Sequence, residues 1–216
     1  MKILVFGATG GSGRAIVARA LAGGHDVTAF ARNPARMDPA PRLTVVAGDA
    51  TRAEDVARAI PGHDAVVISL GERPGRLDWL PGMRRAPPSR VCEIGTRNVI
   101  TALPSGSPPR VVIVSAFGVG DTRETAPWYY RLYLRIFLRE LMADKERQEA
   151  LLKSTGLDVL IVQPVALTDG PATGRWLASA QGQIRRQQVS RSDLAEFIVT
   201  ELSERRHGRE TVAFSG

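Results

Sequence analysis

The feature that most constrains the fold is a glycine-rich turn near the start of the chain, between an apolar run and an amphipathic segment. Residues 2–6 have the composition of a strand, glycines follow at positions 7, 10 and 13, and residues 12–23 have helical periodicity. Gly7 would permit the tight turn, Gly10 would let a pyrophosphate approach the backbone, and Gly13 would let the helix pack closely on the strand. The first N–H groups of that helix would face the anion. We therefore predict a dinucleotide site, with a purely structural glycine turn as the alternative.

The rest of the chain alternates short apolar runs, rich in β-branched residues, with helix-length amphipathic segments. Strands are expected at residues 2–6, 26–31, 43–47, 64–70, 110–116 and 157–162, with a weaker one at 210–214. Helices are expected at residues 12–23, 52–60, 89–102, 127–154 with an interruption, and 192–204. This alternation predicts an α/β fold with a doubly wound parallel sheet of the Rossmann type. A length of 216 residues favours one NAD(P)-binding domain spanning 1–216.

Local signals mark two helix ends and the walls of a site. Thr51 and Glu54 have the spacing of a capping box before the helix at 52–60, and Gly156 is expected to end the long helical region in a left-handed conformation. Open α/β sheets bind ligands outside the carboxyl ends of their strands, so the segments that follow strand ends are expected to supply substrate-site elements. These segments are 71–88, 117–143 and 164–190.

Composition excludes several classes of protein. With 44% hydrophobic and 24% charged residues the chain has the make-up of a globular domain, and no apolar run approaches the length of a membrane helix. The apolar run at 2–6 is too short for a secretory signal, so a cytoplasmic location is expected. The single cysteine, Cys92, cannot form an internal disulfide. His25, His63 and His207 lack metal-ligand spacing, so no metal site is expected.

The chain is basic, and almost all of its positive charge is arginine. Lysine and arginine total 29 against 22 acidic residues, for a net charge of +7, and the lysines are Lys2, Lys145 and Lys153. The arginines are scattered without a long basic run, which favours a solvated surface, although a polyanion-binding face or a phosphorylated cofactor also fits the charge. No nucleic-acid-binding module is recognisable, so no nucleic acid is expected as a partner.

The end of the second expected strand indicates which cofactor the site prefers. A site for NAD(H) usually has an acidic residue there, which binds the ribose 2′-hydroxyl, whereas a site for NADP(H) has arginine near the 2′-phosphate. Arg32 follows the strand at 26–31, Arg36 comes four residues later, and no carboxylate stands at the strand end. Two guanidinium groups can grip a phosphate. We predict that NADP(H) is preferred over NAD(H); the alternative is that both belong to the scattered arginine set.

An ordered series of short motifs resembles the atypical short-chain dehydrogenase/reductases, in the small NAD(P)H-binding group of NmrA-like and biliverdin reductase B-like (flavin reductase) proteins. The resemblance covers nearly the whole chain. The motifs are the glycine turn at 7–13, Ala31-Arg32-Asn33 with Arg36, Gly48-Asp49-Ala50, and residues 64–71, 114–118, 145–149, 154–158 and 163–167. Within the last motif, Gln163 stands where many relatives have arginine.

The resemblance implies a set of cofactor contacts at the ends of successive strands. The pyrophosphate would lie on the turn made by Gly7, Thr9, Gly10, Gly11, Ser12 and Gly13, and the 2′-phosphate on Arg32 and Arg36. The adenine would lie beside Asp49 and Ala50, and the ribose beside Leu70 and Gly71. The nicotinamide would lie among Ser115, Pro164, Val165 and Leu167.

Typical short-chain dehydrogenases protonate a carbonyl with a tyrosine four residues before a lysine. The tyrosines of this chain are Tyr129, Tyr130 and Tyr133, and the position four before Lys145 is Leu141, so the pair is missing. Dehydrogenases and epimerases of the Tyr/Lys type are therefore not expected. We predict an NADPH-dependent oxidoreductase that passes hydride to a planar conjugated acceptor, such as a flavin, quinone or tetrapyrrole-like molecule. The alternative is a non-catalytic NADP(H)-sensing regulatory protein of the NmrA-like type.

Two residues are candidates for a direct part in the chemistry. Lys145 can donate as a compact charge, or it can be a solvated helix residue that pairs with Glu149. Ser115 can donate to a carboxamide or to a substrate carbonyl, or it can cap the end of its strand.

The segment 128–139 contains every tyrosine of the chain and a stripe of arginines at 131, 135 and 139. Its apolar arc is wider than a helix packed on one core needs. It is expected to be a lid over a planar substrate or a homodimer surface through 127–142, with interfacial membrane contact as a third alternative.

Overall fold

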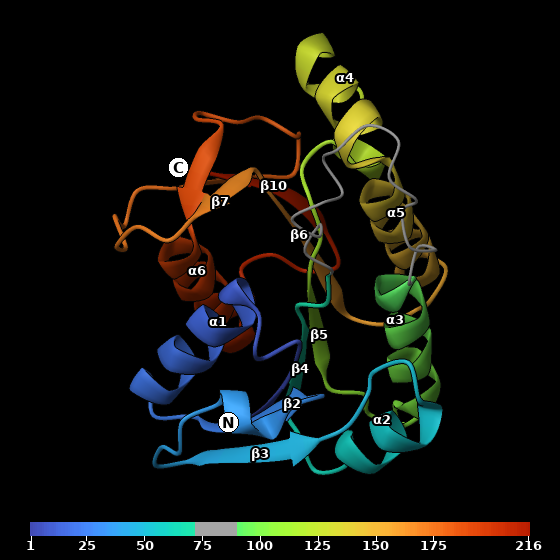
Figure 1. The fold of residues 1–216 in the computed structure, drawn as a ribbon, viewed down its shortest axis with the longest axis vertical. Coiled ribbons are helices and arrows are strands. Elements are labelled where there is room, and N and C mark those ends of the chain that lie inside the picture. Colours follow the sequence, from blue (N-terminus) through green and yellow to red (C-terminus); the bar gives the residue numbers. More distant parts are fainter. Residues whose placement is uncertain (72–89) are drawn as a thin grey trace.

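The chain folds around one mostly parallel sheet that has helices on both faces (Figure 1). The computed structural model describes residues 1–71 and 90–216. The strands lie in the order β3-β2-β1-β4-β5-β6-β10-β8, and β8 runs antiparallel to β10. Their bounds are β1 (Lys2–Phe6), β2 (Asp26–Ala31), β3 (Leu43–Ala47), β4 (Ala65–Ile68), β5 (Arg110–Val114), β6 (Val159–Pro164), β8 (Leu177–Ser179) and β10 (Thr211–Ser215). A smaller parallel sheet pairs β7 (Ala166–Thr168) with β9 (Gln188–Ser190).

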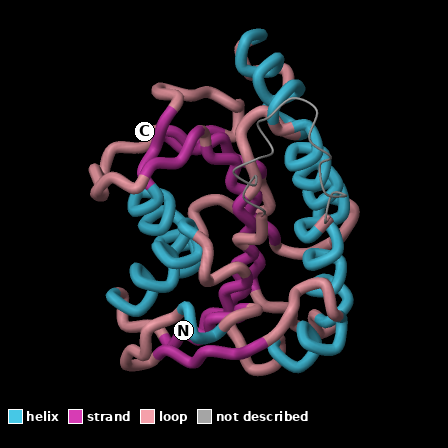
Figure 2. The backbone as a smooth tube through the Cα atoms, viewed as in Figure 1, coloured by secondary structure: helices cyan, strands magenta, loops and turns pink. Residues whose placement is uncertain are grey.

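The helices form two layers that enclose the sheet (Figure 2). The pair α1 (Gly11–Ala22) and α6 (Arg191–Glu204) packs together on one face. The other face carries α2 (Ala53–Ala59), α3 (Val91–Ala102) and α5 (Arg139–Lys153). Two short 3-10 helices follow strands: η1 (Pro34–Arg36) follows β2, and η2 (Gly120–Thr122) follows β5. This is the predicted single-domain Rossmann-type fold.

The central strands β1, β4, β5 and β6 are apolar apart from Lys2, Arg110 and Gln163, because both faces of the sheet are buried. In β1, Ile3 and Val5 contribute to the core shared with α1 and α6. The alternate residues Leu4 and Phe6 contribute to the core on the other face, which includes Leu152 of α5. The alternation of side chains in one strand therefore serves two separate cores.

The capping box predicted before α2 is wrong. The helix begins at Ala53, and its N-cap is Arg52, which makes no capping hydrogen bond through its side chain. Thr51 instead donates its hydroxyl hydrogen to Oδ1 of Asp49 at 2.8 Å, and the same oxygen accepts from the N–H of Thr51 at 2.9 Å. The nearby carboxylate therefore competes successfully for the threonine.

The left-handed helix end predicted at Gly156 is also wrong. The structure gives positive φ to other glycines but not to Gly156, and α5 ends at Lys153 with Ser154 in a right-handed conformation. Three short strands, β7, β8 and β9, were not expected from the sequence. Each has three residues, which is too short to show an alternating pattern.

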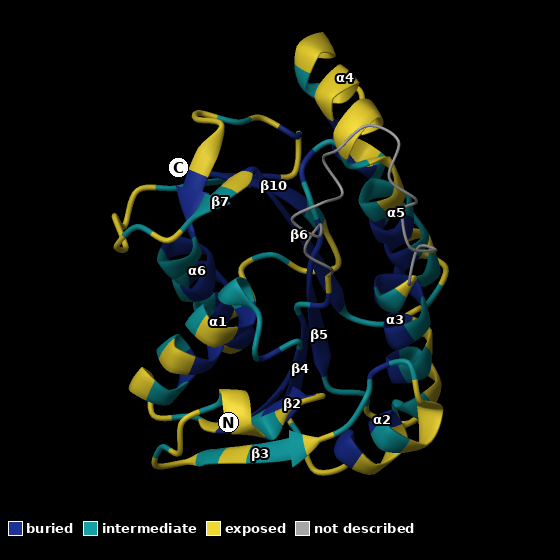
Figure 3. Cartoon of the chain, viewed as in Figure 1, coloured by how far each residue is buried: buried dark blue, intermediate teal, exposed yellow. Residues whose placement is uncertain are grey.

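The predicted interruption of the long helical region is confirmed. A first helix, α4 (Trp128–Phe137), ends before Leu138, whose φ of −123° breaks the helix, and α5 follows at once. At the top of Figure 1, α4 extends beyond the sheet, and Figure 3 shows that most of its surface is exposed. Leu134 is its buried residue. Within residues 1–71 and 90–216, no helix is long and apolar enough to cross a membrane.

Candidate functional site

The glycine turn between β1 and α1 has the backbone geometry that the sequence predicts. Gly7 has a φ of +74°, and a Cβ there would lie 2.3 Å from the carbonyl oxygen of Ser69. A Cβ on Gly13 would lie 2.1 Å from the carbonyl oxygen of Gly7, so α1 approaches β1 closely because Gly13 has no side chain. The N–H of Gly10 donates to the carbonyl oxygen of Gly7 at 3.0 Å and closes the turn.

The N-terminus of α1 offers hydrogen-bond donors to a ligand. Its N-cap is Gly10, which has no side chain with which to cap the first turn. A Cβ on Gly10 would meet only the carbonyl oxygen of Gly7, at 3.3 Å, so there is space above this residue. The first N–H groups of a helix have no partner within the helix, and they attract anions. The turn, which also includes the partly exposed Thr9 and Ser12, therefore fits a pyrophosphate.

An arginine that the sequence analysis did not single out lies against the same turn. Arg191, the first residue of α6, has its Nε 2.7 Å from the place that a Cβ on Gly11 would take. Its Nη1 is 2.6 Å from Oδ1 of Asp169. The packing of α6 on α1 brings Arg191 to the turn, so only the tertiary structure distinguishes it from the other scattered arginines. Its guanidinium adds positive charge beside the helix N-terminus.

The residues predicted to bind a 2′-phosphate lie at the end of β2. Arg32 directly follows the strand, Arg36 ends η1, and both are exposed. Between them, Oδ1 of Asn33 accepts from the N–H of Ala35 at 3.2 Å and holds the turn. Arg14 of α1 donates to the carbonyl oxygen of Arg36 at 2.5 Å, which ties this loop to the glycine turn. No carboxylate of the described residues forms an ion pair with Arg32 or Arg36, so both guanidinium groups can bind a phosphate.

The residues expected beside the adenine lie on the loop after β3. Asp49 uses Oδ1 within the loop, as described above, and its N–H donates to Oδ2 of Asp55 at 3.0 Å. That hydrogen bond lowers the pKa of the Asp55 carboxyl. The carbonyl oxygen of Ala50 accepts from Nδ2 of Asn98 in α3 at 2.9 Å. This loop is therefore held in place by α2 and α3.

Lys145 is buried, and it is neither solvated nor paired with Glu149. Its Nζ donates to the carbonyl oxygens of Leu70 at 2.7 Å and Val114 at 2.6 Å, and it lies 3.3 Å from Oε1 of Gln148. An ammonium group has three hydrogens, and all three have acceptors here. The lysine therefore links the chain beyond β4 to the end of β5.

Asp144, which precedes Lys145 in α5, binds the backbone at the start of α3. The carboxylate of Asp144 accepts from the N–H of Cys92 at 2.9 Å and from the N–H of Glu93 at 3.0 Å. Cys92 lies against the carbonyl oxygen of Leu70, with its Sγ at 3.4 Å. Burial raises the pKa of the Cys92 thiol to about 11. The thiol is neutral near pH 7, so Cys92 belongs to the scaffold and is not a nucleophile.

Ser115 lies at the end of β5, and its hydroxyl donates to the carboxylate of Glu149 in α5. Gln163 of β6 donates from Nε2 to both oxygens of that carboxylate, at 2.8 and 3.0 Å, and to the carbonyl oxygen of Val119 at 2.9 Å. Nζ of Lys153 lies 3.5 Å from Oε2 of Glu149. Ser115, Glu149 and Gln163 are each at most 5% exposed. Neither Glu149 nor Gln163 was expected in the site from the sequence.

A narrow crevice of about 10 Å³ lies where α4 joins the sheet. It is lined by Phe117, Pro127, Tyr130, Val165, Ile184 and Gln187. The rings of Phe117 and Tyr130 are 5.9 Å apart, and burial raises the pKa of the Tyr130 phenol. The segments 117–143 and 164–190 therefore meet beyond the ends of β5 and β6. Of the segment 71–88, only residue 71 lies within the described residues.

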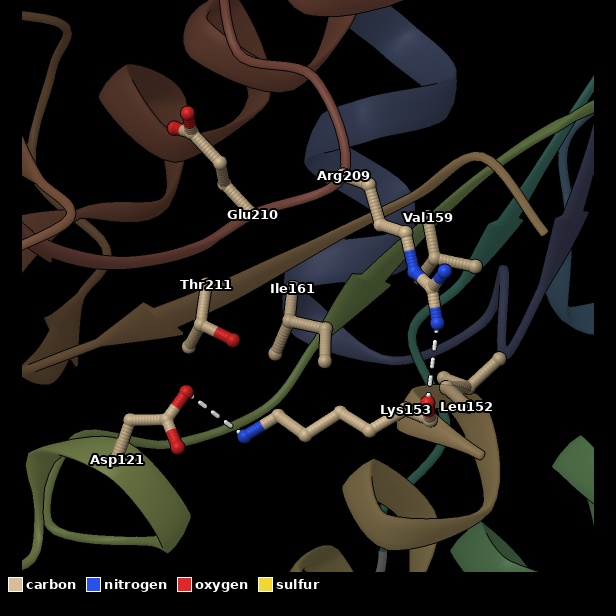
Figure 4. Close-up of a pocket in the computed structure, with 8 residues that line it drawn as sticks. All are labelled: Asp121, Leu152, Lys153, Val159, Ile161, Arg209, Glu210 and Thr211. Atoms are coloured by element: carbon tan, nitrogen blue, oxygen red, sulfur yellow. Dashed lines mark hydrogen bonds and ion pairs between the residues drawn. The ribbon is translucent and has the colours of Figure 1, made fainter. Parts of the chain in front are cut away.

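A larger cavity, of about 250 Å³, lies elsewhere and is shown in Figure 4. It is lined by Asp121, Leu152, Lys153, Val159, Ile161, Arg209, Glu210 and Thr211. The ammonium of Lys153 is 2.8 Å from Oδ2 of Asp121, and this contact lowers the pKa of the Asp121 carboxyl. Val159 and Ile161 lie in the first half of β6, so this cavity is not at the carboxyl edge. Residues 1–71 and 90–216 contain no group of three or more His, Cys, Asp or Glu side chains that could hold a metal ion.

A family model described as NAD(P)H-binding matches residues 7–205 of the chain. An uncharacterised chloroplastic protein of Arabidopsis thaliana is 30% identical over 210 residues, which are 93% of this chain and 71% of that protein. The matched region includes both the glycine turn and the segments at the carboxyl edge of the sheet.

Solved structures of reductases have the same fold. A short-chain dehydrogenase/reductase from Veillonella parvula, crystallised with NADP, has a TM-score of 0.81 at 18% identity, covering 100% of this chain and 94% of that one. An anaerobilin reductase from Escherichia coli has a TM-score of 0.75 at 23% identity, covering 100% and 97%. A Streptococcus pneumoniae protein assigned as an NADH-flavin reductase has a TM-score of 0.74 at 22% identity, covering 99% and 98%. At these identities the likeness concerns the fold.

Proposed function

The chain belongs to the NAD(P)H-binding family, and from this premise we propose that it is an NADPH-dependent reductase that passes hydride to a planar conjugated acceptor. The observation that carries the choice of cofactor is the pair of exposed arginines, Arg32 and Arg36, beside the open N-terminus of α1. A cofactor with a 2′-phosphate has charges that match both places. The nicotinamide supplies the hydride when the cofactor is bound.

The chain's own residues would bind and orient the cofactor. The pyrophosphate would lie on Gly7, Thr9, Gly10, Gly11, Ser12 and Gly13, with Arg191 as a further cationic contact. Asp49 and Ala50 would flank the adenine, and Leu70 and Gly71 the ribose. The nicotinamide would lie near Ser115, Pro164, Val165 and Leu167. Most of these positions lie at or just after the ends of β1, β3, β4, β5 and β6, which the parallel sheet brings to one edge.

The proposed acceptor is a flavin, a quinone or a tetrapyrrole-like molecule. Aromatic and apolar side chains from Phe117, Tyr130 and Val165 line the crevice at the base of α4. Its volume of about 10 Å³ is too small to enclose a conjugated ring, so the acceptor would stack across the mouth of this crevice. Similar folds include an anaerobilin reductase and a protein assigned as a flavin reductase. Their names give an anaerobilin and a flavin as the acceptors of those proteins, which supports this class of acceptor.

We also propose that α4 covers the acceptor or joins two copies of the chain through 127–142. Trp128 is 71% exposed and Ile136 is 51% exposed, so this helix presents apolar surface that one domain does not bury. Its first turn contacts the site, because Tyr130 packs on Phe117. A cytoplasmic location and the absence of a nucleic-acid partner stay predictions.

One observation favours a second function, that of an NADP(H) sensor without turnover. The hydroxyl of Ser115 and the ammonium of Lys145 both have acceptors inside the protein, so neither group is poised to donate to a substrate. A sensor needs only the cofactor site and a surface that changes with cofactor state.

Oxidation of NADPH, followed with a panel of flavins, quinones and tetrapyrroles, separates the two functions. A reductase consumes many equivalents of NADPH per protein with at least one acceptor. The variant Gly10→Trp should abolish this turnover, because its side chain fills the space above the turn. Binding of NADPH with only background oxidation across the panel would favour the sensor.

A further inference from the structure

The carboxylate of Glu149 accepts hydrogen bonds from Ser115 and Gln163, which lie at the ends of two adjacent strands. A serine hydroxyl has one hydrogen, and that of Ser115 goes to Glu149. The side-chain amide of Gln163 has two hydrogens, which go to Glu149 and to the carbonyl oxygen of Val119. Neither side chain has a donor hydrogen left over. What each can still offer to a ligand is an acceptor oxygen.

The orientation of the Gln163 amide follows from its surroundings. A carboxylate and a carbonyl oxygen lie on one side of it, and a rotated amide would place its own oxygen against both. The nitrogen must therefore face Glu149, and Oε1 faces away. This Oε1 is buried and has no hydrogen-bond donor among the described residues. A buried acceptor without a donor is costly, so it suits a site that a ligand donor completes.

Ser115 and Gln163 are neighbouring residues at the carboxyl edge of the sheet. Val114 and Val162 are partners in the register of β5 and β6, so the following residues, Ser115 and Gln163, are neighbours. Both side chains bind Glu149, so both point to the face of the sheet that α5 covers. The ammonium of Lys153 also lies on this side of the sheet, 3.5 Å from Oε2 of Glu149.

We propose that Glu149 sets the hydrogen-bond polarity of the acceptor site, so that Ser115 and Gln163 accept rather than donate, and the site selects hydride acceptors that present an N–H. This inference rests on the proposed reductase function. A flavin ring or a linear tetrapyrrole has N–H groups that can donate to such a pair. A quinone has only carbonyl oxygens, which would face acceptor oxygens without a hydrogen between them. Glu149 is then a positioning residue that determines specificity.

The test compares kcat/KM for FMN, which has a ring N–H, with kcat/KM for menadione, which has only carbonyl oxygens. In Glu149→Gln the new amide can donate to Ser115, and the serine hydroxyl is released to donate to a ligand. We expect the FMN-to-menadione ratio to fall about tenfold, the effect of roughly one net hydrogen bond. The ratio does not depend on the folded fraction of the preparation, because both values of kcat/KM are measured on the same preparation and scale with its active concentration in the same way.

The matched control is Glu146→Gln, one turn earlier on α5, where the carboxylate pairs with Arg123 at the surface. It should keep the wild-type ratio. If Glu149→Gln fails to fold, Ser115→Ala tests the same point, since loss of the acceptor oxygen should also lower the ratio.

An unchanged ratio in Glu149→Gln and Ser115→Ala overturns the inference and leaves the reductase function standing. An equal loss with both acceptors in Ser115→Ala, together with a higher KM for NADPH, also overturns it, because the serine would then serve the cofactor. A wild-type protein that turns over neither acceptor, nor any other of the panel, overturns the proposed function and this inference together.

Discussion

Replacing Arg32 with alanine should weaken NADPH binding and leave NADH binding almost unchanged. Arg32 is exposed and has no ion pair with a described carboxylate, so the substitution removes no contact that the structure shows within the fold. A charge-assisted bond to a phosphate is worth roughly 1.5 to 3 kcal/mol when it is shielded from water. Because the guanidinium is exposed, we expect about 1 kcal/mol, or about a fivefold increase in the Kd for NADPH. Removing Arg36 as well should bring the total to about 25-fold.

Calorimetric titration of both reduced cofactors, at low and at high salt, measures this effect. The loss should be confined to NADPH and should shrink as salt screens the phosphate. The matched control is Arg206→Ala, which removes an exposed arginine that pairs with Glu204. A double variant of Arg32 and Arg36 that kept its preference for NADPH would refute the reasoning. Equal losses for the two cofactors would assign these arginines to the pyrophosphate.

Three further predictions concern the packing of Gly13, the titration of Cys92 and the role of α4. Gly13→Ala should lower the free energy of unfolding by more than about 3 kcal/mol, since its Cβ would lie 2.1 Å from a backbone oxygen; an unchanged melting temperature would contradict this. The Cys92 thiol should resist alkylation below about pH 10, and stability should fall between pH 9 and about 11, because the unfolded chain loses the thiol proton first; rapid labelling at pH 8 would be inconsistent. If α4 is a lid, the double variant Tyr130→Ala with Tyr133→Ala should raise the KM for the conjugated acceptor and leave the molecular mass in solution unchanged. If α4 is a dimer interface, the same variant should dissociate the dimer. Size-exclusion chromatography and acceptor kinetics distinguish the two, and a variant with unchanged mass and unchanged KM would exclude both roles.

Local patterns predict the part of the site that depends on the backbone. The glycines of the first turn are needed because of contacts within one strand–turn–helix unit, and Gly13 against Gly7 is such a contact. The arginines after β2 are likewise placed by the strand that precedes them. Parallel strands bring their carboxyl ends to one edge, so the order of elements places Asp49 and Ser115 at the same edge without any knowledge of side-chain contacts.

The partners of buried polar side chains are what sequence patterns do not predict. Lys145 and Glu149 have the spacing of a helical ion pair, yet Lys145 binds two backbone carbonyl oxygens and Glu149 binds Ser115. The spacing rule describes an isolated helix in water. In the folded chain the buried carbonyl groups near the strand ends would lose free energy of hydrogen bonding if they had no donor. That loss is larger than the stabilisation from a helical ion pair that water would screen. Arg191 was missed for a related reason, since helix packing alone brings it to the glycine turn.

The charged stretch of α5 links the scaffold to the site. Its residues look solvated in the sequence, but four of them, Asp144, Lys145, Gln148 and Glu149, are buried against the sheet and α3. Asp144 holds the start of α3, Lys145 holds the ends of two strands, and Gln148 donates to Oγ1 of Thr96 at 2.7 Å. Each of these groups has its hydrogen-bond partners, so the network is rigid and costly to disturb. Glu149 lies on the same helix, so the packing of α5 also positions the carboxylate that binds Ser115. We therefore expect a substitution at Glu149 to change which acceptor is reduced without touching the cofactor.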